Sequence, residues 1–223
     1  MNASTSTECG HIGCTTFFGD VLATVPNAIT GVRVVGVLVL AALAVQADDP
    51  SVLLAIALAV YWVGDMADGA VARWLHRESR TGAMLDILGD RLSVIAILGI
   101  YVSDHPNAAL PAAIFLLQFG FVDAYLGTAF LRWSLLSANY FGLVDRRLYL
   151  ANWSPVAKGL NTSAVVLLWL ATEDVVVVSL VASLYLLLKL ASLVRMSHIS
   201  VPRALTGCAV VDSHPAALRS VAA

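Results

Sequence analysis

Six stretches of mostly apolar residues, separated by short polar connections, constrain the fold of this 223-residue chain more than any other feature. A run of about 20 predominantly apolar residues crosses a bilayer as one helix. With 59% hydrophobic and 13% charged residues, the chain is also more apolar than a soluble domain of its length. We therefore predict an all-α polytopic membrane protein with six transmembrane helices, near residues 28–47, 51–75, 83–103, 107–133, 156–172 and 175–196.

The chain divides into a six-span domain at 28–196 and two flanking segments. In the N-terminal segment 1–27, one face of a short helix would carry Phe17, Phe18, Val21, Leu22 and Val25. Such a face predicts an amphipathic helix lying at the membrane interface. The tail 197–223 mixes polar residues, Pro and Ala without periodicity, and we expect it to be disordered.

The charges in the connections predict the orientation. The connections at 48–50, 104–106 and 173–174 carry acids or histidine and no Lys or Arg, whereas the opposite connections hold most of the basic residues. The positive-inside rule places the basic set in the cytoplasm. Both termini would then be cytoplasmic in a protein of the cell membrane, and nothing in the charge pattern suggests a nucleic-acid partner.

Four aspartates lie inside the second and third predicted helices, at Asp65, Asp68, Asp86 and Asp90. Each uncompensated charge at the centre of a membrane helix costs roughly 2.5–3.5 kcal/mol. Residues three or four apart share a helix face, so both pairs can meet in one cleft between antiparallel neighbours. Clustered carboxylates favour hard cations such as Mg²⁺, Mn²⁺ or Ca²⁺. A Lys or Arg filling the gap between them would contradict this metal-site prediction.

The aspartate cluster also suits two other protein classes, and a second group of residues could be interpreted as a zinc site. A cation transporter also uses intramembrane acids, but it usually has two matching halves, and this chain has one acidic cluster. A membrane prenyltransferase would need two separate Asp-rich motifs. The cluster of Cys9, His11 and Cys14 offers three soft ligands, where structural zinc takes four.

The acidic cluster is part of a longer pattern, D-x2-D-G-x2-A-R-x8-G-x3-D-x3-D, which runs from Asp65 to Asp90. This stretch resembles the signature of the CDP-alcohol phosphatidyltransferase family at all eight specified positions. The segment from Pro26 to Arg33 is similar to the PN-x2-T-x2-R opening of glycerophosphate-type members. The segment from Lys158 to Thr162 is similar to an element of phosphatidylglycerophosphate and cardiolipin synthases, with one extra residue.

The resemblance implies transfer of a phosphatidyl group from CDP-diacylglycerol to an alcohol, with release of CMP, in phospholipid biosynthesis. It implies a homodimer and a two-metal Mg²⁺ or Mn²⁺ centre on Asp65, Asp68 and Asp86, with Asp90 as general base and further metal contact. The CDP-binding residues would be Gly69, Ala72, Arg73, Gly82, Asn27, Thr30 and Arg33. Glycerol 3-phosphate or phosphatidylglycerol is the favoured acceptor, and inositol phosphate or another polyol is the alternative.

Several residues outside the motif have two interpretations. The cations at the cytoplasmic ends of the later helices either bind a phosphate on the acceptor or extend to the lipid headgroups: Arg132, Lys158, Lys189 and Arg195. Asp123, inside the fourth span, is expected to pair with a neighbouring helix rather than to act in catalysis. His76 and Glu78, between the motif halves, are expected to be solvated loop residues.

Overall fold

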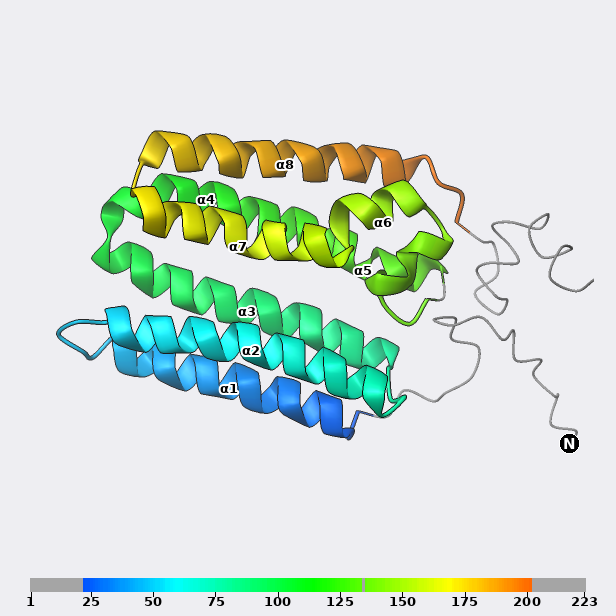
Figure 1. Cartoon of the computed structure of the whole chain (residues 1–223), viewed down its shortest axis with the longest axis horizontal. Helices are drawn as coiled ribbons and strands as arrows, with labels where there is room; N and C mark the ends of the chain where they lie inside the picture. The colour runs from blue at the N-terminus through cyan, green and yellow to red at the C-terminus, as the bar shows by residue number, and fades with distance from the viewer. Residues whose placement is uncertain (1–21, 134, 202–223) are drawn as a thin grey trace, which may run out of the picture.

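The computed structural model describes residues 22–133 and 135–201, and the elements found there are helices (Figure 1). Their order along the chain is α1 (Val25–Ala44), α2 (Ser51–Trp74), α3 (Arg80–Asp104), η1 (Pro106–Ala108), α4 (Ala109–Leu116), η2 (Leu117–Asp123), α5 (Ala124–Thr128), η3 (Ala129–Trp133), η4 (Ala138–Leu143), α6 (Arg146–Asn152), α7 (Pro155–Thr172) and α8 (Val175–Ser197). The all-α prediction is confirmed for these residues. The expected interfacial helix depends on residues 17–21, and most of the expected tail follows residue 201, so both lie outside the described chain.

The helices form two groups that run side by side (Figure 1). In the first group α1 packs against both α2 and α3. In the second, α8 packs against α4, α7 and η2, while α5, η4 and α6 gather at one end. The segment from η1 to η3 is continuously helical but changes its winding, since η2 is a π-helical stretch. Such stretches are frequent at functional sites.

Local sequence signals explain where the main helices begin and end. The side chains of Thr24, Ser79, Ser154 and Asp174 accept hydrogen bonds from backbone N–H groups in the first turns of α1, α3, α7 and α8. These N-caps satisfy N–H groups that have no partner within the helix. At the other end of α7, Glu173 adopts a left-handed conformation (φ 50°) that stops the helix before α8 begins.

Four described segments are long and apolar enough to cross a membrane: α1, α2, the run from Pro106 to Trp133, and α8. Their outward faces carry large exposed apolar side chains, such as Val32, Phe121 and Leu187. Lipid, rather than a protein core, suits such faces. Helices α3 and α7 coincide with the remaining two predicted spans but are more polar. Helix α3 carries several charged residues, and the first half of α7 contains Lys158 and Asn161. Six spans therefore remain a prediction.

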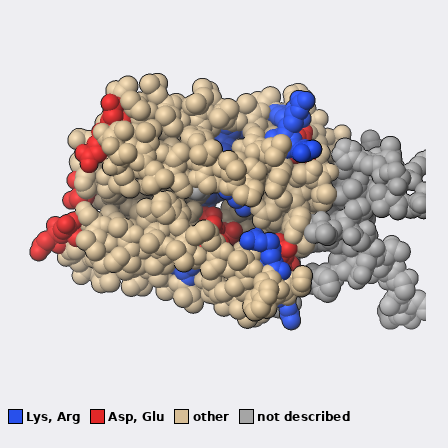
Figure 2. All heavy atoms as spheres, viewed as in Figure 1, with Lys and Arg blue, Asp and Glu red and all other residues tan. Residues whose placement is uncertain are grey.

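Charge is distributed unevenly along the bundle. The α1–α2, α3–η1 and α7–α8 connections lie at one end, where acidic side chains gather (left in Figures 1 and 2). Basic side chains lie toward the opposite end and in a hollow midway along the face shown (Figure 2). The charges of the connections predict this separation of acidic and basic ends. The hollow adjoins the candidate functional site.

Candidate functional site

The four motif aspartates converge between α2 and α3. Oxygen atoms of Asp65, Asp68 and Asp86 lie within 4.8 Å of one another. Asp68 is buried, and its Oδ2 accepts a 2.8 Å hydrogen bond from the Thr30 hydroxyl of α1. Asp90 is one turn beyond Asp86 and lies outside this group of three. The expected meeting of the two acidic faces is therefore present, with three carboxylates grouped closely and Asp90 beside them.

Arg33 of α1 lies among these carboxylates. Its guanidinium nitrogens are 2.9 Å from Asp86 Oδ1, 3.0 Å from Asp90 Oδ1, 3.2 Å from Asp65 Oδ1 and 3.8 Å from Asp68 Oδ2. The Arg33 side chain is only 1% exposed. The expectation made Arg33 a ligand for CDP, whereas the structure makes it the internal counter-ion of the acidic cluster.

Two glycines allow Arg33 to reach the acids. A Cβ at Gly64 would lie 2.5 Å from Arg33 Cδ, and a Cβ at Gly89 would lie 2.7 Å from Val34 Cγ2 and 3.5 Å from an Arg33 nitrogen. Any side chain at either position would displace α1 or its arginine. Gly64 precedes the motif and Gly89 occupies one of its unspecified positions, so only the packing shows their role.

The position of Arg33 bears directly on whether cations fit the site. One guanidinium offsets one of four carboxylates, so the cluster keeps a formal charge of −3 if all four are ionised. The three grouped oxygens are hard donors at a spacing suited to a shared divalent cation, and Mg²⁺ uses few carboxylates together with water and substrate phosphates. The donor set therefore suits a divalent cation. Arg33, however, already lies between the carboxylates, which is the arrangement that counts against the metal-site prediction made from the sequence.

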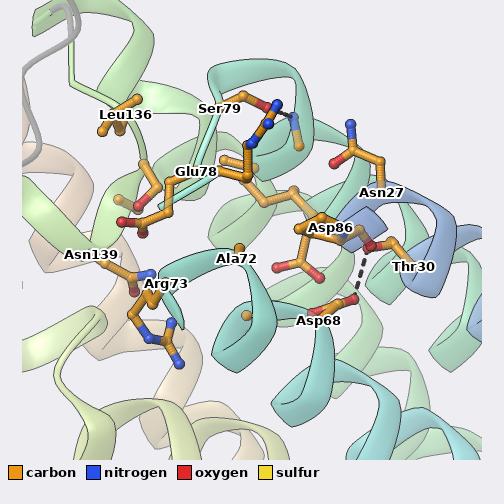
Figure 3. Close-up of a pocket in the computed structure, with 18 of the residues that line it drawn as sticks. Asn27, Thr30, Asp68, Ala72, Arg73, Glu78, Ser79, Asp86, Leu136 and Asn139 are labelled. Atoms are coloured by element: carbon orange, nitrogen blue, oxygen red, sulfur yellow. Dashed lines mark hydrogen bonds between the residues drawn. The ribbon is translucent and has the colours of Figure 1, made fainter. Parts of the chain in front are cut away.

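A cleft with polar and apolar lining adjoins the acids on the side facing the basic end of the bundle. Its volume is about 110 Å³, so it could hold only part of a large ligand. The cleft is lined by the first turn of α1, the motif face of α2 and α3, the connection between them, and residues 136–139. Figure 3 shows Asp68 and Asp86 on one side, Glu78 and Asn139 on the other, and Ala72 between them.

Small motif residues keep the wall of the cleft open. A Cβ at Gly82 would lie 2.7 Å from Asn27 Oδ1, and a Cβ at Gly69 would lie 3.3 Å from an Arg73 nitrogen. The Gly82 N–H donates to the Ser79 Oγ in the first turn of α3. The cleft thus contains six of the seven expected CDP-binding residues, the exception being Arg33: Asn27, Thr30, Gly69, Ala72, Arg73 and Gly82.

Asp123 is held in a separate buried network. It accepts hydrogen bonds from Lys189 (2.6 Å), Arg91 (2.7 Å) and Asn161 (3.4 Å), which belong to α8, α3 and α7. Gln118 donates to Asn161 in turn. The intramembrane acid is therefore paired structurally, and it joins helices of both groups.

The four expected acceptor-binding cations lie in different places. Only Lys158 lines the cleft. Lys189 is buried against Asp123, Arg195 pairs with Asp145 at 2.7 Å, and the exposed Arg132 hydrogen-bonds to Tyr125 and contacts its ring. The structure brings one of these cations to the cleft and the other three to separate partners.

Glu78 differs most from its expectation as a solvated loop residue. It is half-buried, it lines the cleft, and its Oε2 accepts a 2.6 Å hydrogen bond from the Tyr140 hydroxyl. Burial, reinforced by the Glu78 carboxylate, raises the pKa of Tyr140, so the phenol stays protonated and can donate. Tyr140 and the cleft residues Ser137 and Asn139 carry no motif signal, so sequence reasoning did not find them.

Comparison with known proteins agrees with this geometry. The family model for CDP-alcohol phosphatidyltransferase matches residues 23–194, a range that contains the acidic cluster and the cleft. Searches of curated proteins and of solved structures returned no match. Because the matched range covers most of the chain, this protein belongs to the CDP-alcohol phosphatidyltransferase family.

Proposed function

We propose that the protein transfers the phosphatidyl group of CDP-diacylglycerol to an alcohol acceptor and releases CMP. The family makes phospholipids from CDP-linked alcohols, which supports the reaction class. The observation that carries the proposal is the convergence of Asp65, Asp68 and Asp86 beside a cleft lined by the small motif residues. Apolar outer helix faces would keep the diacylglycerol chains in the bilayer.

The residues divide the chemistry among them. Asp65, Asp68 and Asp86 would hold two Mg²⁺ or Mn²⁺ ions, which when bound neutralise the diphosphate and the departing CMP. Thr30 orients Asp68 through its hydroxyl. Gly69, Ala72 and Gly82 leave room for the nucleotide close to the helix backbone, with Asn27 beside Gly82.

Asp90 would act as general base. It takes the proton of the acceptor hydroxyl as that oxygen forms a bond to the lipid-side phosphorus, and the bond from this phosphorus to the CMP oxygen breaks. Asp90 lies outside the group formed by Asp65, Asp68 and Asp86, which supports a role distinct from metal binding by those three. Arg33, close to all four acids, would limit their mutual repulsion before the substrate arrives.

We further propose six spans, a homodimer and cytoplasmic termini, with the active site at the cytoplasmic leaflet of the cell membrane. The charge difference between the two ends of the bundle supports this orientation. The acceptor would be glycerol 3-phosphate or phosphatidylglycerol, and Lys158 in the cleft is the cation placed to contact a phosphate on it. Inositol phosphate or another polyol is the alternative.

The test is release of CMP by the purified full-length protein from CDP-diacylglycerol with a panel of acceptors, with Mg²⁺ or Mn²⁺ present or chelated. We expect metal-dependent release with one acceptor class. A cation transporter would release no CMP with any acceptor, and that result would refute the proposal.

A further inference from the structure

The connection between α2 and α3 places the Glu78 carboxylate at one end of the cleft (Figure 3). The backbone N–H of Arg77 donates to the Ala72 carbonyl, His76 takes a left-handed conformation (φ 51°), and Ser79 caps α3. Glu78 lies between these two fixed points. Its position is therefore determined by both helix ends rather than by a free loop.

The opposite wall of the cleft fixes the same carboxylate from outside the motif. Residues 136–139 line the cleft, and the fully buried Leu135 and Phe141 anchor them on either side in an apolar cluster with Trp133. Tyr140, next along the chain, donates its hydroxyl to Glu78 Oε2. The bond joins positions 62 residues apart.

Polar groups at this end remain available for a ligand. The bond from Tyr140 uses only Oε2 of Glu78, and among the described residues the buried Ser137 Oγ has no hydrogen-bond partner. An ionised carboxylate only accepts hydrogen bonds, so a ligand group at Glu78 must be a donor. Glu78 lies across the cleft from Asp68 and Asp86, with Ala72 between (Figure 3).

This arrangement matches the two ends of a cytidine nucleotide. A nucleotide whose phosphates lie at the aspartates would direct its base toward Glu78. Cytosine carries an exocyclic amine, which donates hydrogen bonds. Uracil carries an oxygen at the same position, which accepts them. Carboxylates recognise cytosine through that amine. We infer that Glu78, held by Tyr140, accepts a hydrogen bond from the cytosine amine and thereby selects cytidine over uridine nucleotides. The inference rests on the proposed function.

The test compares binding of CMP and UMP to the full-length protein in nanodiscs with Mn²⁺, by titration calorimetry. One well-placed pair of this kind discriminates bases by roughly 5- to 150-fold. We expect the wild type to bind CMP about tenfold or more tightly than UMP. N4,N4-dimethyl-CMP, which lacks the donor, should bind as weakly as UMP, and this comparison needs no variant.

Two variants separate base recognition from a purely structural contact. In Glu78→Gln the amide oxygen can still accept from Tyr140, while the amide N–H₂ faces the base and suits uracil. We expect the CMP-to-UMP preference to fall to about one or to invert. Tyr140→Phe should reduce the preference less, because the carboxylate remains but is no longer held. Glu173→Gln, in the α7–α8 connection at the other end of the bundle, is the control and should keep the wild-type preference.

Three outcomes overturn the inference. Equal binding of CMP and UMP by a wild type that still releases CMP from CDP-diacylglycerol overturns this inference alone. Equal losses for both nucleotides in Glu78→Gln and Tyr140→Phe would assign the contact to folding only. A protein that binds neither nucleotide and releases no CMP overturns the proposed function and this inference together.

Discussion

Replacing Arg33 with Met tests how the acidic cluster is balanced. The change keeps an apolar stem of similar length and removes the charge that lies 2.9–3.8 Å from four carboxylates. Charges about 4 Å apart attract by about 4 kcal/mol each at an effective dielectric constant of 20, but burying each ion costs several kcal/mol. Removing one partner of a buried ion pair destabilises by about 3–5 kcal/mol.

The expected effect on thermal unfolding is therefore large and depends on metal. With a chelator present, Arg33→Met should lower Tm by on the order of 10 °C relative to the wild type. Mg²⁺ or Mn²⁺ at about 100 times its Kd adds about 2.7 kcal/mol to the folded state. We expect metal to raise the Tm of both proteins, and to raise that of Arg33→Met further, because the variant has one more uncompensated charge.

The assay is a thermal unfolding series of the wild type and Arg33→Met, with chelator and with each metal. Arg147→Met, which removes an exposed arginine of α6, is the control and should unfold like the wild type. If Arg33→Met matches the wild type in chelator, Arg33 is not the counter-ion. If metal stabilises Arg33→Met and leaves the wild type unchanged, the arginine stands in the place assigned to the metal, and the metal-dependent mechanism is wrong.

Three further predictions concern the reaction and the basic end of the bundle. Asp90→Asn should lower turnover at least 100-fold, in the range typical of a lost general base, with little change in nucleotide affinity. Retained turnover in a CMP-release assay would exclude Asp90 as the base. Lys158→Ala should raise the KM for a phosphorylated acceptor about tenfold or more, whereas Arg132→Ala should leave that KM unchanged. If the KM of Lys158→Ala equals that of the wild type, Lys158 is not part of the acceptor site. Burial acts to raise the pKa of Asp145, but hydrogen bonds from Arg195 and the α6 backbone outweigh it and hold that pKa below 3.8. The stability that the ionised Asp145 adds is present above pH 3.8 and is lost as pH falls through its lower folded pKa. The Tm should therefore drop more steeply in acid for the wild type than for Asp145→Asn, which keeps a helix-capping side chain. Parallel curves of Tm against pH would contradict this.

The sequence alone was sufficient for features that depend on short-range regularity. Apolar runs of helical length predict the main helices, and the spacing of Asp65, Asp68 and Asp86 predicts that they share facing stripes. Both predictions follow from the 3.6-residue period, which relates side chains three or four positions apart. The family signature is read from the same local spacing, and the family match supports it.

Only the tertiary structure decided which distant side chains meet those stripes. Arg33 contacts Asp86 across 53 positions because Gly64 and Gly89 leave space for it, and Tyr140 reaches Glu78 from a segment without a motif. Asp123 likewise acquires its partners from three other helices. Such contacts depend on how helices are offset and rotated against one another, and helical period within a single segment does not specify that packing.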